Sequence, residues 1–146
     1  MSPPTENEKP VVLIAEDDAD DRFLLELAFQ KFEGVLDITF VKDGEELMDY
    51  LLRQGTHTGP LPSVGLILLD LNMPRIDGRE ALAEIRGRAV LQSIPIVIWT
   101  TSMEDEDREY CADLGAEDFV TKPVGFDDLD ATVRDIVKER LRSPSN

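Results

Sequence analysis

Short runs of apolar residues alternate along the chain with segments in which apolar residues recur at helical spacing. The runs are continuous rather than interrupted by polar residues, which is typical of strands buried on both faces of a sheet. They predict strands at residues 11–16, 36–41, 66–70, 94–100 and 117–122. The other segments predict helices at residues 18–32, 45–53, 79–86 and 104–115, and a last helix whose apolar residues reach 141.

The first and last predicted helices have apolar faces suited to docking on a sheet. In the first helix Phe23 and Leu27 lie at helical spacing, with Leu24, Ala28 and Phe32 on the adjoining flank. We expect this face to be buried. The last helix has a wider apolar stripe, made of Leu129, Val133, Ile136, Val137 and Leu141.

Regular alternation of five strands with five helices predicts an α/β fold, a (βα)5 doubly wound arrangement with helices on both faces of a mainly parallel sheet. Right-handed crossovers place every junction from strand to helix along the same edge of that sheet. The chain length favours one domain, at residues 11–141. The polar, proline-containing ends, residues 1–10 and 142–146, are expected to be disordered tails.

Composition narrows the classes of partner. The net charge is −16, with 31 acidic and 15 basic residues, which argues against DNA or an anionic membrane as a direct partner. The one cysteine, Cys111, excludes an intrachain disulfide and is expected to be a packing residue. The apolar runs are too short to span a bilayer and the N-terminus has no signal-peptide core. We therefore expect a cytoplasmic protein.

Polar side chains end four of the five predicted strands. Glu16 and Asp17 end the first strand, Asp70 the third, Thr100 the fourth and Lys122 the fifth. In an open α/β sheet, ligands bind beyond the carboxyl ends of the strands, near the point where the strand order reverses. If the first and third strands are neighbours there, the three carboxylates converge.

Three carboxylates in one small cleft must share a proton or hold a cation. At about 5 Å and an effective dielectric of about 20, each pair costs roughly 3 kcal/mol before screening. A few carboxylates with water suit Mg²⁺. Lys122 could then grip a phosphoryl oxygen, Thr100 offers a hydroxyl donor, and Asp70 is a carboxylate nucleophile able to form an acyl phosphate.

Each of these residues also has an ordinary structural interpretation. Acids after a strand are often helix N-caps, as expected for Asp18 and Asp20, and a threonine at the end of a strand is usually structural. A lysine followed by proline is usually a turn. The joint interpretation is favoured because the set ends several strands in this order.

The motifs around these residues resemble those of response-regulator receiver domains. They are "VVLIAEDD", "LILLDLNMPRIDG", "IPIVIWTTS" and "GAEDFVTKPV", and the resemblance covers residues 11–141. It implies a flavodoxin-like sheet with strand order 2-1-3-4-5, and Asp70 as phosphoacceptor. It also implies Mg²⁺ bound directly by Asp17 and Asp70, through water by Glu16, and by the backbone carbonyl of Asn72.

The same resemblance implies how the phosphoryl group is held and sensed. Thr100 and Lys122 bind it, and Thr100 moves toward it while Phe119, at the aromatic switch position, fills the vacated space. This remodels the face made by the fourth helix, fifth strand and fifth helix. Pro123 is expected to follow a cis peptide bond.

The resemblance also implies a partner. A histidine kinase donates the phosphoryl group, because His57, the one histidine, lies in a Gly/Pro loop unlike a kinase phosphorylation site. The long loop at residues 54–65 and the two central motifs are similar to stand-alone regulators paired with phytochrome-type kinases, which often dimerise through the switch face. The expected protein is a signalling switch that assists its own phosphoryl transfer and dephosphorylation. It is not an enzyme, and it acts through protein contacts.

Three rival classes fit less well. An aspartyl-phosphate phosphatase or mutase would need a second aspartate two residues after the nucleophile, where Asn72 stands. A flavin or nucleotide module would need a glycine loop after the first strand, whereas "AEDDADD" has no glycine and would repel phosphate. A pseudo-receiver that acts only as an interaction module would have lost one of the acids or the lysine.

Overall fold

Five parallel strands form one sheet in the order β2-β1-β3-β4-β5, within residues 9–53, 63–73, 75 and 77–141, which the computed structural model describes. The strands are β1 (Val11–Ala15), β2 (Asp37–Val41), β3 (Val64–Leu69), β4 (Ile96–Thr100) and β5 (Asp118–Thr121). Every pairing is parallel. The predicted fold class and strand order are therefore confirmed, and the order reverses between β1 and β3.

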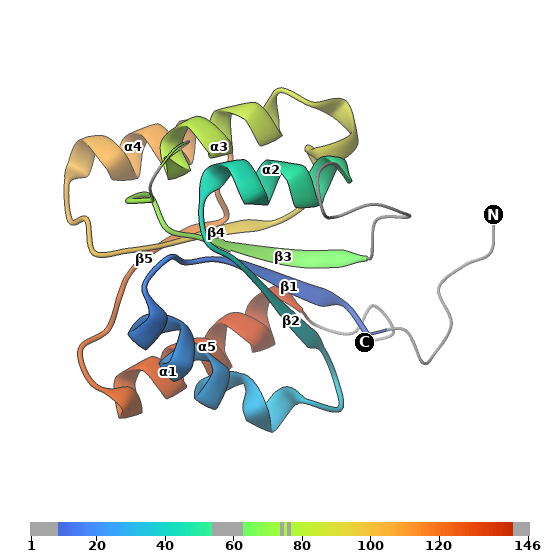
Figure 1. The fold of residues 1–146 in the computed structure, drawn as a ribbon. Helices are drawn as coiled ribbons and strands as arrows, with labels where there is room; N and C mark the ends of the chain where they lie inside the picture. The colour runs from blue at the N-terminus through green and yellow to red at the C-terminus, as the bar shows by residue number, and fades with distance from the viewer. Residues whose placement is uncertain (1–8, 54–62, 74, 76, 142–146) are drawn as a thin grey trace.

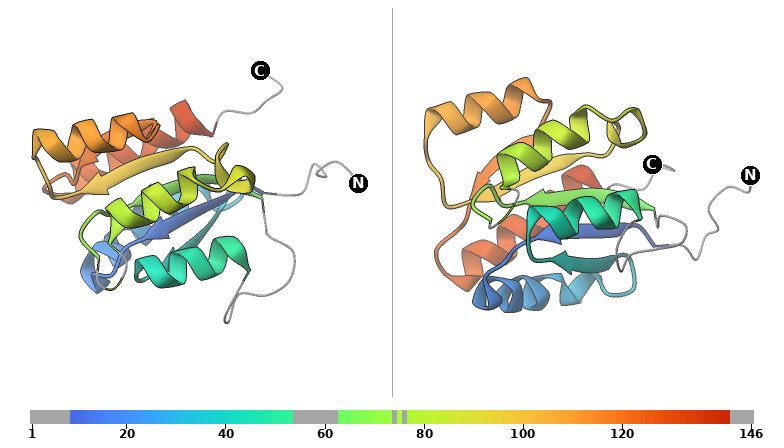
Figure 2. Two further views of the ribbon diagram at one scale, coloured as in Figure 1. Left: turned by 90° about the horizontal axis from the view of Figure 1, so that it is seen from above. Right: turned by 45° about the horizontal axis from the view of Figure 1, so that its top comes forward.

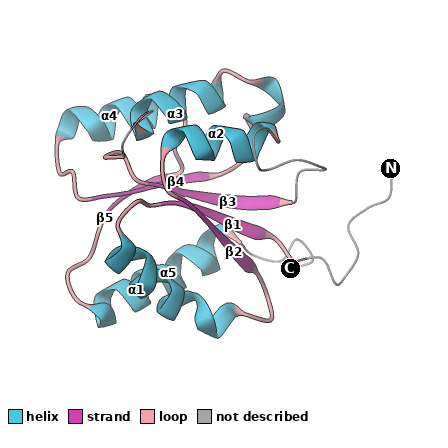
Figure 3. Cartoon of the chain, in the orientation of Figure 1, coloured by secondary structure: helices cyan, strands magenta, loops and turns pink. Residues whose placement is uncertain are grey.

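Helices cover both faces of the sheet (Figure 1). They are α1 (Ala19–Phe29), α2 (Gly44–Leu52), α3 (Gly78–Arg86), α4 (Asp105–Asp113) and α5 (Phe126–Arg140), with short 3₁₀ turns at Gln30–Phe32 and Ala89–Leu91. α1 and α5 lie on one face, and α2, α3 and α4 lie side by side on the other, as the view from above shows (Figure 2). Each strand is followed by a helix (Figure 3), so every strand-to-helix junction lies at the same sheet edge.

Two apolar clusters hold these layers together. On the α1/α5 face the cluster includes Trp99, which is 2% exposed, with Leu25, Val133 and Ile136. The opposite cluster contains Cys111 of α4, whose buried position confirms it as a packing residue. Burial raises the pKa of the Cys111 thiol to about 11, so it is protonated at neutral pH.

The predicted buried face of α1 is wrong in part. Phe23 is 60% exposed and Leu27 37% exposed, while the helix buries Leu25, Ala28 and Phe29. Apolar residues occupy almost every position from 23 to 29, so spacing alone does not choose one stripe. The choice is made by packing, because α1 shares an apolar cluster with the sheet residues Val12 and Ile14 and also packs against α5.

The expected cis peptide bond before Pro123 is also wrong. No cis bond occurs among the described residues, and the bond from Lys122 to Pro123 is trans. The trans isomer is favoured by about 0.5–1 kcal/mol for a bond to proline. The chain instead turns into α5 at Gly125, where a φ of 92° suits a residue without a Cβ.

Several predictions fall outside the described residues. The tails lie there except for residues 9 and 10, and so do His57 and most of the loop at 54–65. The limits of these segments therefore stay predictions. Among the helices of the described chain, none has the length and apolar character needed to cross a bilayer.

Gly78 offers a test of how tightly the site is built. A Cβ there would lie 2.3 Å from the carbonyl oxygen of Asp70 and 2.6 Å from Cα of Leu71. These are backbone atoms that cannot move cheaply, so Gly78→Ala is expected to lower the free energy of unfolding by about 2 kcal/mol or more. Gly34→Ala, with nothing within 4 Å, should change it by less than about 0.5 kcal/mol. Urea unfolding of both variants measures the difference, and equal stabilities would contradict the close approach.

Candidate metal and phosphoryl site

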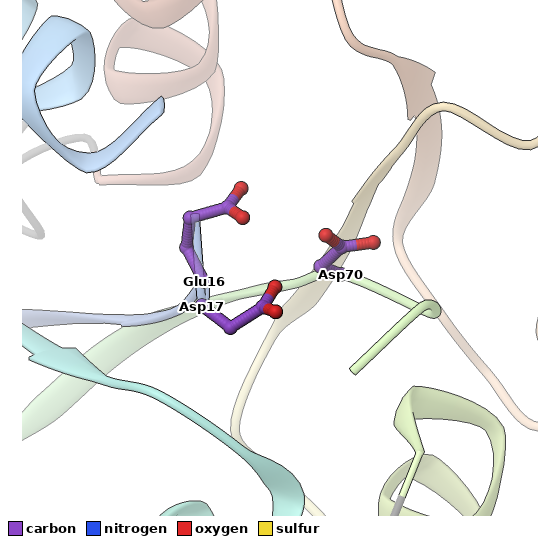
Figure 4. Close-up of side chains that lie close together, drawn as sticks. All are labelled: Glu16, Asp17 and Asp70. Atoms are coloured by element: carbon purple, nitrogen blue, oxygen red, sulfur yellow. The ribbon is translucent and has the colours of Figure 1, made fainter. Parts of the chain in front are cut away.

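The carboxyl ends of β1 and β3 bring three carboxylates together (Figure 4). These strands are neighbours, and the Asp70 amide donates a hydrogen bond to the carbonyl of Ala15 (3.3 Å). Glu16 and Asp17 therefore lie beside Asp70, with one oxygen of each carboxylate within 4.8 Å of the others. Glu16 and Asp70 are buried and Asp17 is exposed, so the cluster opens to solvent on one side.

This donor set fits a hard divalent cation. The three groups supply oxygen atoms only, and the exposed side leaves room for the water ligands that Mg²⁺ retains. The described residues thus contain a candidate metal site at the predicted acids. The fourth predicted ligand, Asn72, lies beside it: its amide donates to Asp70 Oδ1 (3.0 Å). The role of its carbonyl stays a prediction.

Lys122 supplies the positive charge among these acids. Its Nζ lies 2.7 Å from Glu16 Oε1, 3.0 Å from Asp70 Oδ2 and 3.0 Å from Asp21 Oδ2. Burial alone would lower the pKa of Lys122, but the contacts with Glu16 and Asp21 and the charge of Asp70 outweigh it and raise that pKa. Lys122 is therefore a fixed cation at neutral pH.

Glu16 is the most confined of the acids. It is 0% exposed, its Oε2 accepts a hydrogen bond from the amide of Asp18 (3.2 Å), and its Oε1 is in ion-pair contact with Lys122. Burial raises the pKa of Glu16 above its usual value, although Lys122 acts in the opposite direction. A cation at the cluster would favour the ionised form.

Asp21 also belongs to this site, although the sequence pattern did not lead us to predict it. It lies in the first turn of α1, and its amide is capped by Asp18 Oδ1 (3.0 Å), which confirms Asp18 as N-cap. Asp20, also expected to cap, is an ordinary first-turn residue. The signal was available, because a helix that begins directly after Asp17 keeps its first turn at the sheet edge.

Thr100 ends β4 next to the acids. It is fully buried, and its Oγ1 accepts hydrogen bonds from Asn72 Nδ2 (3.4 Å) and the amide of Ser102 (3.3 Å). With two bonds accepted, the hydroxyl proton remains to be donated. The structure thus places Thr100 beside Asn72, whose own amide holds Asp70.

Phe119 lies on β5, two positions before the partner of Thr100. Ile98 pairs with Phe119 and Thr100 pairs with Thr121, so the side chains of Thr100 and Phe119 share the sheet face covered by α3 and α4. Phe119 is partly buried there, with the Arg108 guanidinium 4.7 Å from its ring centroid. The two residues are placed for coupling, and the switch itself stays a prediction.

A second charged cluster, near Thr100, was also missed. Arg79 at the start of α3 forms a bidentate pair with Asp107 of α4, at 2.7 and 2.6 Å. Ser102 donates to the same carboxylate (2.6 Å). The hydrogen bonds of Arg79 and Ser102 lower the pKa of Asp107. A single aspartate within the acidic run 104–107 gives no sequence signal of its own.

Comparison with known proteins identifies the class. Residues 12–134 match the response regulator receiver domain family, and the chain belongs to this family. It is 35% identical over 130 residues to the response regulator Rcp1 of Synechocystis sp., covering 89% of this chain and 88% of Rcp1. It is 33% identical over 137 residues to the "Probable methanogenesis regulatory protein FilR2" of Methanothrix harundinacea, covering 92% and 87%.

Solved structures of similar proteins have the same fold. The phosphorylated cyanobacterial phytochrome response regulator RcpA superposes with a TM-score of 0.85 at 33% identity, covering 91% of this chain and 94% of RcpA. The Mn²⁺-bound form of Rcp1 gives a TM-score of 0.81 at 34% identity, covering 88% and 92%. The fold is therefore that of a receiver domain.

The substitution Lys122→Met tests whether the Lys122 ammonium group stabilises the carboxylates of Glu16 and Asp70. The substitution leaves buried Glu16 facing Asp70 without a cation, so the free energy of unfolding in metal-free buffer should fall by about 3 kcal/mol. Added Mg²⁺ should restore more stability to this variant than it adds to the wild type, since the ion replaces the missing charge. Thermal and urea unfolding with EDTA or Mg²⁺ measure this. Lys138→Met, at an exposed position of α5, is the control, and identical behaviour of the two variants would refute the assignment.

Asp107→Asn tests the second cluster through its pH dependence. The pKa of Asp107 in the folded protein lies below its usual 3.8. The stability that ionised Asp107 adds is therefore fully present above pH 3.8 and is lost as the pH falls through the pKa of the folded state. Arg79 is one-third exposed, so we expect a loss of about 2 kcal/mol at neutral pH, shrinking toward zero in acid. Urea unfolding from neutral pH to about pH 3 measures it. Asp105→Asn, at an exposed position in the same turn, should lack this profile; a pH-independent loss in Asp107→Asn would contradict the ionic contribution.

Proposed function

We propose that the protein is a phosphorylation switch in which Asp70 accepts a phosphoryl group from the phosphohistidine of a histidine kinase. The observation that carries this proposal is the position of Asp70: it is buried against two other acids, and both of its oxygens are already held, one by the Asn72 amide and the other by Lys122. Membership of the receiver family supports the kinase as the type of donor.

The chain's share of the chemistry is positioning and charge neutralisation. One oxygen of Asp70 attacks phosphorus, the O–P bond forms, and the N–P bond to the donor imidazole breaks. Lys122 lies within reach of the oxygens that gain charge, and Thr100 has a proton to donate to one of them. We propose Glu16, Asp17, Asp70 and the Asn72 carbonyl as the site for Mg²⁺, which would neutralise the phosphoryl oxygens when bound.

We further propose that phosphorylation is sensed through Thr100 and Phe119. A phosphoryl oxygen on Asp70 would attract the Thr100 proton, and Phe119 shares the sheet face from which Thr100 would move. The output would be a contact with another protein or with a second copy of this chain through α4, β5 and α5. The proposed role is that of a signalling switch that assists its own phosphoryl transfer and dephosphorylation, rather than a turnover enzyme.

A phytochrome-type kinase is the donor that the similar proteins favour. Solved structures similar to this chain include the cyanobacterial phytochrome response regulator RcpA and a response regulator in red light signaling of R. palustris, the latter with a TM-score of 0.78 at 29% identity. A light-sensing kinase would therefore be the first donor to test. The acidic net charge favours a protein rather than a nucleic acid as partner.

Phosphorylation of Asp70 can be measured directly. Incubated with a small-molecule phosphodonor and Mg²⁺, the wild type should gain one phosphoryl group by intact mass, and none when EDTA replaces Mg²⁺. Asp70→Asn should gain none, and Asp17→Asn should be labelled at least about tenfold more slowly because a metal ligand is lost. Equal labelling of Asp70→Asn would disprove the site.

The same assay tests the partner and the assembly. Autophosphorylated phytochrome-type kinase should label the wild type faster than a histidine kinase with a different sensor, and a slower rate would sink the light-signalling assignment. Size-exclusion chromatography of labelled and unlabelled protein tests the proposed dimer. A monomer in both states would exclude self-association as the output.

A further inference from the structure

The pair of Arg79 and Asp107 joins two helices beside the phosphoryl site. Arg79 stands in the first turn of α3 and Asp107 in the first turn of α4. Of the three acids in that turn of α4, only Asp107 is buried. Both carboxylate oxygens bond to the guanidinium, the geometry that gives such pairs their directional specificity.

Ser102 connects this pair to Thr100. Its hydroxyl donates to Asp107 Oδ2 (2.6 Å) and accepts from the amide of Glu104 (3.3 Å), so its orientation is set from the α4 side. Its backbone amide donates to Thr100 Oγ1 (3.3 Å). One residue therefore bonds to the predicted phosphoryl ligand and to the buried carboxylate.

Two routes of hydrogen bonds join Asp70 to Arg79. Thr100 accepts from the Asn72 side chain, and the Asn72 amide bonds to Asp70. On the other side, the Gly78 amide, next to Arg79, donates to the carbonyl of Leu71 (3.0 Å), the residue after Asp70. Arg79 is thus tied to Asp70 by two routes, one through Asp107, Ser102 and Thr100, and one through the backbone of Gly78.

We propose that Asp107 is a positioning residue for Thr100, acting through Ser102, and that this contact carries the state of Asp70 to Arg79 on α3. The inference rests on the proposed function. When a phosphoryl group attracts the Thr100 hydroxyl, the bond from the Ser102 amide must be remade. The hydrogen bond from the Ser102 hydroxyl to Asp107 then changes, and with it the pairing of Asp107 with Arg79. Because Arg79 is one-third exposed, the change reaches the protein surface. A partner reading this switch would contact α3 as well as α4.

The Arg79 side chain provides its own reporter, because its Nε–H donates to Asp107 Oδ1 and is expected to give a distinct NMR resonance. With Mg²⁺ present, beryllofluoride serves as the phosphoryl mimic. In the wild type the resonances of the Asn72 and Thr100 amides and of Arg79 Nε–H should all shift. Ser102→Ala keeps the Arg79–Asp107 pair, so the Arg79 resonance should persist but no longer respond, while the Asn72 amide still does.

The outcomes of this experiment distinguish the inference about Arg79 from the proposed function. An Arg79 resonance that fails to move in the wild type while the Asn72 amide moves would overturn the inference and leave the proposed function intact. A response retained in Ser102→Ala would assign the signal to the Gly78 route and also overturn it. No beryllofluoride response anywhere would overturn the proposed function and this inference with it. Asp105→Asn, which removes an exposed acid of the same turn, should behave as the wild type.

Discussion

Repulsion among the acids at one edge of the sheet is the constraint on which the rest of the structure depends. Glu16, Asp21 and Asp70 all contact the ammonium group of Lys122, and Asp17 lies beside Glu16 and Asp70. Each acid pair at this spacing costs energy on the order of kcal/mol, and burial of Glu16 adds a desolvation penalty. One lysine cannot neutralise four carboxylates. The site therefore has a built-in demand for further positive charge, which explains why a divalent cation fits it.

The α/β frame makes this unfavourable arrangement possible. β1 and β3 are buried on both faces, and their apolar side chains anchor the acids that follow them. Gly78 lets α3 approach the backbone of Asp70 and Leu71 more closely than any other residue would permit. The stability of the core thus offsets the cost of the charges, as is general for sites in which polar groups are concentrated for function.

The parts of the site that could be predicted from sequence are those fixed by the ends of strands. Glu16, Asp70 and Thr100 stand at the ends of buried apolar runs and Lys122 follows the partly buried β5, and parallel topology alone brings such positions to one edge. Asp21 could have been predicted from its place in a helix that begins at the sheet edge. Asp107 could not be predicted, because its role depends on which way α4 faces and the acidic run around it hides a single functional residue. The exposed Phe23 of α1 has the same cause: where every position is apolar, packing rather than periodicity selects the buried stripe.

The Lys122 contacts also show why phosphorylation would change the structure beyond Asp70. Lys122 divides its three contacts among Glu16, Asp21 and Asp70, so a phosphoryl group that recruits it must draw it from at least one of the other acids. A cation held by Glu16 and Asp17 would offset that loss, whereas Asp21 on α1 would lose its contact with Lys122. Under the proposed function, charge added at Asp70 would therefore act in two directions, toward α1 through Lys122 and toward β4 through Thr100. The proposed switch would arise because few positive charges are shared among many acids, so that a change in this sharing would move an element that holds one of the acids.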